Sequence, residues 1–132
     1  TNTTKETTTT SAKETTDTEK YFAESKLERE NMYSEMLESY QSILASTNVS
    51  AEQKSTSQKE ISTINSQKNA IMIAENLIKT KGISDVVIFV NDKSINVIVK
   101  ADTLEQETIA QIQNIIAREM NAEIENIHIS NK

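Results

Sequence analysis

A single glycine, Gly82, lies where the spacing of apolar residues changes. Upstream of Gly82, apolar residues recur every three or four positions, which is typical of amphipathic helices. Downstream, residues 86–90 are all β-branched or aromatic, and in residues 95–99 the apolar side chains Ile95, Val97 and Val99 recur at every second position. The sequence also contains no proline. These features predict two long helices followed by a shorter segment that carries the strands.

The first helix is expected over residues 21–46, where the apolar stripe is best developed in the second half. Ser50 and Gln53 have the S-x-x-Q spacing of a capping box, which predicts the start of a second helix running to about residue 81. Gly82 then stands where a left-handed residue closes a helix, and Ile83 is placed to contact Ile78. Gly82 is therefore expected to have a structural role.

Two strands, residues 86–90 and 95–99, are predicted on either side of a turn at residues 91–93. A third helix is expected after a cap at Asp102 or Thr103, Asn121 can end it, and residues 126–130 form a closing strand. The order predicts an α+β fold: two N-terminal helices, then β-β-α-β, as a three-stranded sheet with helices packed on one face. A sheet this small has two edges, and an edge can pair with a strand of a partner protein.

Residues 1–20 include ten threonines and one hydrophobic residue, Ala12. Such a segment buries too little apolar surface to offset the entropy of ordering, so we expect a disordered linker followed by one domain over residues 21–132. The sequence contains no apolar run of the roughly 18 to 20 residues that cross a bilayer. It begins with threonine, and we expect a processed form or fragment that is soluble as given.

Composition excludes most common site chemistry. Without cysteine there is no disulfide, thiolate nucleophile or zinc finger, and one glycine does not suffice for a dinucleotide-binding or phosphate-binding loop. A net charge of −6 disfavours nucleic acid as a partner. We therefore expect no catalytic residue, no cofactor and no metal.

His128, the one histidine, lies between Ile127 and Ile129, so it is expected to point away from the helices. A lone histidine is an inadequate metal site unless carboxylates converge on it, and Glu123 and Glu125 are merely its sequence neighbours. Two alternatives stay open. One is a small acidic metal-dependent hydrolase that uses His128, and the other is a helical self-association module formed by residues 21–81.

The favoured interpretation is a noncatalytic interaction domain in which an edge strand and the adjoining helix meet a partner. The predicted outward-facing side chains near the edge are polar and uncharged, and such groups lose their hydration at lower cost than charged groups. These candidate interface residues are Ser94, Asn96, Asn126, His128 and Ser130.

Residues 74–88 and 95–101, together with the later helix over 109–118 and the ending at 126–130, resemble the stage III sporulation protein AH family. The resemblance covers roughly residues 21–132. It implies a ring-building motif fold, similar to ring-forming subunits of type III secretion systems, and an upstream anchor in the mother-cell membrane.

The resemblance also implies a location and partners. The domain would lie between mother cell and forespore and bind the stage II sporulation protein Q, which has a LytM-like fold. Together they would form a channel needed during engulfment, with further copies or other stage III sporulation proteins in a ring.

Overall fold

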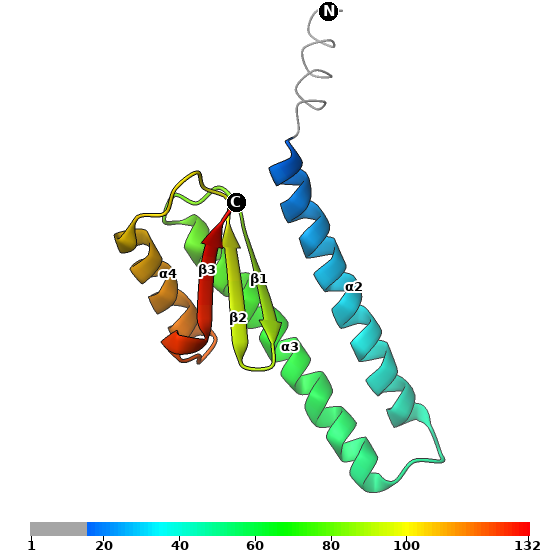
Figure 1. Ribbon diagram of the computed structural model, residues 1–132. Helices are drawn as coiled ribbons and strands as arrows, with labels where there is room; N and C mark the ends of the chain where they lie inside the picture. The colour runs from blue at the N-terminus through cyan, green and yellow to red at the C-terminus, as the bar shows by residue number, and fades with distance from the viewer. Residues whose placement is uncertain (1–15) are drawn as a thin grey trace, which may run out of the picture.

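The computed structural model describes residues 16–132, which form a long helical hairpin joined to a small sheet (Figure 1). The hairpin consists of α2 (Asp17–Ala45) and α3 (Ala51–Lys79). The elements that follow are β1 (Val86–Asn91), β2 (Ser94–Val99), α4 (Gln106–Glu119), the short 3₁₀ helix η1 (Ile124–Asn126) and β3 (Ile127–Asn131). The predicted α+β order of two helices followed by β-β-α-β is therefore confirmed.

The sheet has the strand order β1-β2-β3, with β1 and β2 antiparallel and β2 and β3 parallel. Figure 1 shows α3 and α4 behind one face of the sheet, with α2 on the β1 side. Side chains of alternate strand residues enter the core between the sheet and the helices. The strand residues of this core are Val86, Ile88, Ile95, Val97, Val99 and Ile127, and the helices contribute Tyr33, Ile64, Ile71, Ala74, Ile78, Ile112, Ile115 and Ile116.

The helix α2 starts at Asp17, four residues earlier than predicted. The Thr16 side chain caps the helix by accepting a hydrogen bond from the backbone N–H of Glu19 at 3.1 Å. Acidic residues in the first turn also suit the positive end of the helix dipole. The predicted linker over residues 1–20 is therefore too long at its C-terminal end, and its residues 1–15 lie outside the described residues.

The capping box predicted at the start of α3 is confirmed, and Gly82 is left-handed as predicted, although α3 ends at Lys79 rather than at about residue 81. Ser50 and Gln53 form the complete capping box. Gly82 has a φ of 91°, and its N–H donates to the carbonyl of Lys79 at 3.2 Å. Ile78 and Ile83 are both buried in the main core. The chain thus turns from α3 into the sheet at the glycine, as the change of spacing indicated.

The start of α4 differs from the prediction of a cap at Asp102 or Thr103. The side-chain amide of Asn131 donates to the carbonyls of Ala101 and Asp102, at 2.9 and 3.0 Å, which ties this segment to the end of β3. The helix consequently begins only at Gln106, without a side-chain cap. Its other end was predicted correctly, since Asn121 has a φ of 51° just after α4.

None of the helices described within residues 16–132 has the length and apolar character needed to cross a bilayer.

Candidate protein interface

The face of the sheet away from α3 and α4 carries four of the five predicted interface residues. Ser94 and Asn96 belong to β2, and His128 and Ser130 belong to β3. Asn96 lies directly beside His128 in the ladder. Because side chains alternate along a strand, these four point opposite to the core residues of β2 and β3. We call this surface the open face, which faces the viewer in Figure 1.

Two half-buried apolar side chains, Phe89 and Ile98, also belong to the open face. Phe89 pairs with Asn96 in the ladder, and Ile98 pairs with Ser130. The centre of the open face therefore combines apolar area with uncharged polar groups, and covering such a surface costs little desolvation energy.

The first turns of α2 bound this surface at the end where β2 and β3 finish. Lys100 forms an ion pair with Glu19 at 3.5 Å, and the ammonium group of Lys132 lies 4.3 Å from the ring centre of Tyr21. Val87, whose position in β1 assigns it to the open face, is fully buried, as is Phe22 of α2. The accessible part of the open face therefore lies around the exposed residues Asn96, His128 and Ser130.

Asn126 is separated from the other four predicted residues. It belongs to η1 rather than to β3, and it is half-buried. Together with Asp92, Lys93 and Asn121, it lines a cavity of about 590 Å³ beside the β1–β2 turn. Sequence parity placed Asn126 on the last strand, whereas the chain is still in a 3₁₀ turn at this position.

The outer edge of β3 pairs with no other strand within residues 16–132. Lys132 directs both of its backbone groups toward β2, donating to Val99 at 2.9 Å and accepting from Ala101 at 3.3 Å. In a parallel ladder such residues alternate, so the intervening Ile129 and Asn131 direct their N–H groups outward. Backbone groups on this edge are therefore available to an added strand.

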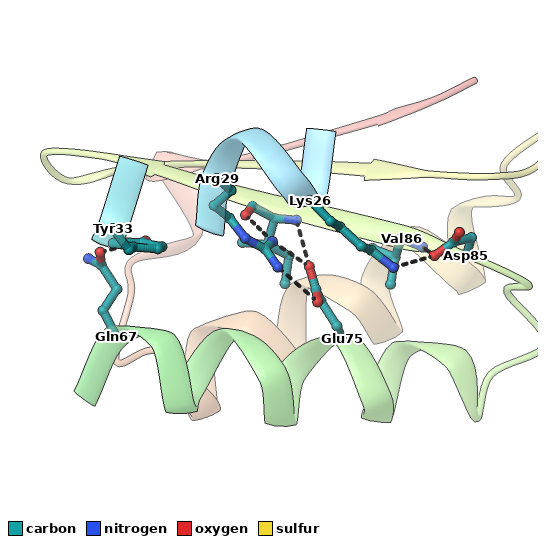
Figure 2. Close-up of polar contacts among 8 residues, drawn as sticks. Lys26, Arg29, Tyr33, Gln67, Glu75, Asp85 and Val86 are labelled. Carbon is teal, nitrogen blue, oxygen red and sulfur yellow. Dashed lines mark hydrogen bonds and ion pairs between the residues drawn. The ribbon is translucent and has the colours of Figure 1, made fainter. Parts of the chain in front are cut away.

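The opposite edge, β1, is covered by side chains that the sequence did not single out (Figure 2). The backbone N–H of Ile88 donates to Oε2 of Glu75 at 3.0 Å, and the carbonyl of Ile88 accepts from Nη1 of Arg29 at 2.8 Å. Arg29 and Glu75 pair with each other at 2.7 Å and are 12% and 11% exposed. The ion pair thus supplies one acceptor and one donor, as a residue of a neighbouring strand would.

A second ion pair covers the start of β1. Oδ1 of Asp85 accepts from the N–H of Val86 at 2.9 Å and from Nζ of Lys26 at 2.6 Å. Partial burial by itself would raise the pKa of Asp85, but the hydrogen bonds from Lys26 and Val86 hold this pKa below its ordinary value. Asp85 is therefore stabilised as a carboxylate that attaches α2 to the sheet.

A third link connects the two long helices. The hydroxyl group of Tyr33 in α2 donates to Oε1 of Gln67 in α3 at 2.9 Å. Burial of the ring raises the pKa of Tyr33, so this group keeps its proton at neutral pH and acts as a donor. Together with the two ion pairs, this bond fixes α2 beside the β1 edge.

His128 is exposed on the open face, and the predicted condition for a metal site is not met there. Within residues 16–132 no group of three histidine, aspartate or glutamate side chains is placed to hold a metal ion. Glu123 and Glu125 are exposed neighbours in sequence and do not form such a group with His128.

Comparison with known proteins gives one family and one solved structure. A chain of the SpoIIQ–SpoIIIAH pore-forming complex superimposes with a TM-score of 0.74 and 22% identity, covering 85% of this chain and 95% of that one. At this identity the likeness shows a common fold. No curated protein matches the sequence. The family model described as SpoIIIAH-like protein matches residues 1–129, so the chain belongs to the SpoIIIAH-like family, and the resemblance seen in the sequence is confirmed.

Proposed function

We propose that this chain is a noncatalytic assembly domain of a sporulation channel complex and that it binds SpoIIQ through the open face and the outer edge of β3. The observation that carries the proposal is the position of an uncharged, partly apolar face directly beside an unpaired strand edge. Family membership and the fold shared with a chain of the SpoIIQ–SpoIIIAH complex support the choice of partner.

In this mode of binding, an extended segment of SpoIIQ adds to β3 as a fourth strand. Backbone hydrogen bonds to the outward groups of Ile129 and Asn131 provide affinity, and contacts with side chains on either side provide specificity. The added strand places its own side chains next to His128 and Ser130, which lie on the strand it joins. The side chain of Ile129 is half-buried on the opposite face of β3, and the added strand would cover it further.

The proposed setting is the space between mother cell and forespore during engulfment. The threonine-rich segment would act as a spacer between the domain and an anchor in the mother-cell membrane. Further copies, or other stage III sporulation proteins, would join in a ring. These proposals rest on family membership.

The two alternative functions gain no support from the described residues. The hydrolase would require two carboxylates to converge on His128, and no such group is present within residues 16–132. The helical module would require the main apolar side chains of α2 and α3 to be free. Tyr33, Ile64 and Ile71 are instead buried in the core shared with the sheet, although Leu27 of α2 and Met72 of α3 are exposed.

The proposal is tested by titrating the purified extracellular domain of SpoIIQ from the same organism into this protein by calorimetry. Ser130→Glu places a charge on the open face, and Ser39→Glu makes the same change at an exposed position of α2. We expect Ser130→Glu to weaken binding at least about tenfold, a loss of about 1.4 kcal/mol, and Ser39→Glu to leave it unchanged. His128→Glu should act like Ser130→Glu.

Each variant is melted first, because only folded variants report on the interface. Unchanged affinity of both open-face variants would rule out this surface. Absence of binding by the wild-type protein would rule out SpoIIQ as the partner.

A further inference from the structure

The outward backbone groups of β1 form a second potential site for strand addition. The carbonyl of Asp85 accepts from the N–H of Lys100 at 2.8 Å, so Asp85 directs its backbone toward β2. In an antiparallel ladder alternate residues do the same, which leaves Val86, Ile88 and Val90 with their backbone groups pointing away from the sheet. Uncovered, this edge would offer the same backbone pattern as the outer edge of β3.

The side chains of β1 make unwanted strand pairing more favourable at this edge than at the edge of β3. Five consecutive residues, 86–90, are β-branched or aromatic, and none is charged. Short segments of this kind readily pair with copies of themselves when their backbone is accessible. The partner that fits an uncovered β1 is therefore the same strand of a second copy.

We propose that the Arg29–Glu75 pair bars strand addition at β1 by a second copy, so that the domain offers a single edge, that of β3, to a partner strand. The pair engages both backbone groups of Ile88, the central outward residue of β1. The neighbouring N–H of Val86 is already taken by Asp85, which Lys26 holds in place. The cover of β1 acts in this way whatever protein binds β3.

An ion pair suits this role better than an apolar side chain. A helix that covered Ile88 with apolar groups would leave its N–H and carbonyl buried without partners. An incoming strand could supply those partners only by moving α2 away from β1 and displacing Arg29 and Glu75, two largely buried charges that would then lose their own contacts. Arg29 and Glu75 belong to the same chain as β1, so their effective concentration at the backbone of Ile88 is high when an incoming strand competes for it.

The test replaces the ion pair by apolar side chains of similar size, in the double variant Arg29→Met/Glu75→Leu. Such replacements of buried ion pairs commonly preserve folding while removing the donor and the acceptor. The matched control, Glu30→Ala/Lys68→Ala, removes a 3.5 Å ion pair between the same two helices that does not touch β1.

Self-pairing through β1 is detected by chemical crosslinking, because the chain contains no cysteine and a single introduced one is unique. Phe89→Cys is added to the wild type, the double variant and the control. In an antiparallel pair of β1 strands centred on Ile88, the two copies of position 89 lie about two residues apart, or about 7 Å along the strand. A short bismaleimide spans this separation.

We expect crosslinked dimer to rise at least about tenfold in the double variant and to stay at the wild-type level in the control. Arg29→Lys provides a conservative second variant, since lysine keeps the charge but lacks the planar fork that serves Glu75 and Ile88 together. Arg29→Lys should give a smaller rise in crosslinked dimer. If the double variant no longer melts cooperatively, the result for Arg29→Lys decides whether the proposal stands. Dimer at the wild-type level in the folded variants would overturn the proposal.

Discussion

The two edges of the sheet differ in whether side chains cover their outward backbone groups. Both β1 and β3 are outermost strands, of six and five residues. The first is apolar over residues 86–90 and is closed by charged side chains from α2 and α3, whereas the second alternates isoleucine with polar residues and is open. A strand that is polar on one face tolerates an open edge, but a continuous apolar strand requires a cover that also satisfies its backbone.

The largest expected effect comes from breaking the cover of β1. Glu75→Ala leaves Arg29 unpaired in a largely buried position and removes the acceptor for the N–H of Ile88. We expect the free energy of unfolding to fall by about 3 to 5 kcal/mol in a urea titration. Glu30→Ala, which removes an exposed ion pair, should cost at most about 1 kcal/mol. Equal costs for the two variants would contradict a special role for Glu75.

An intermediate effect is expected at the open edge. Ile129→Pro removes an outward N–H of β3, and proline is tolerated on edge strands because that N–H faces away from the ladder. SpoIIQ binding should weaken at least about tenfold in calorimetry, while the protein still melts cooperatively. Full retention of affinity by the folded variant would show that no strand adds to β3.

The smallest effect concerns the ion pair at the start of β1. The pKa of Asp85 is lower in the folded protein than in the unfolded chain, so its contribution to stability is present at neutral pH and is lost as pH falls through the folded pKa. Asp85→Asn should therefore be less stable than the wild type at pH 7, and the difference in urea midpoint should vanish in acid. A difference that persists unchanged in acid would exclude the carboxylate as its source.

Local sequence patterns predicted much of the fold because their causes are local. The left-handed Gly82, the capping box at Ser50 and the alternation in β2 each depend on residues within a few positions. The late start of α4 was missed because Asn131, about 30 residues away, holds Ala101 and Asp102 in the preceding loop. The early start of α2 had a local signal, Thr16 followed by acidic residues, within the threonine-rich segment.

The candidate interface was likewise predictable only where it depends on local sequence patterns. Parity along β2 and β3 placed Ser94, Asn96, His128 and Ser130 on one face, but it misplaced Asn126, which lies in a 3₁₀ turn. The cover of β1 joins Arg29 to Glu75, 46 residues apart, and to the backbone of Ile88. No spacing rule reports such a contact, because it depends on how α2, α3 and β1 meet.

Amide hydrogen exchange of the full chain tests the contrast between the edges most directly. The N–H groups of Ile88 and Ile129 both point outward from the sheet, one toward Glu75 and one toward solvent. In a sample dilute enough to be monomeric, we predict that Ile88 exchanges at least about tenfold more slowly than Ile129. Equal exchange rates at the two amides would contradict a sheet with one closed and one open edge.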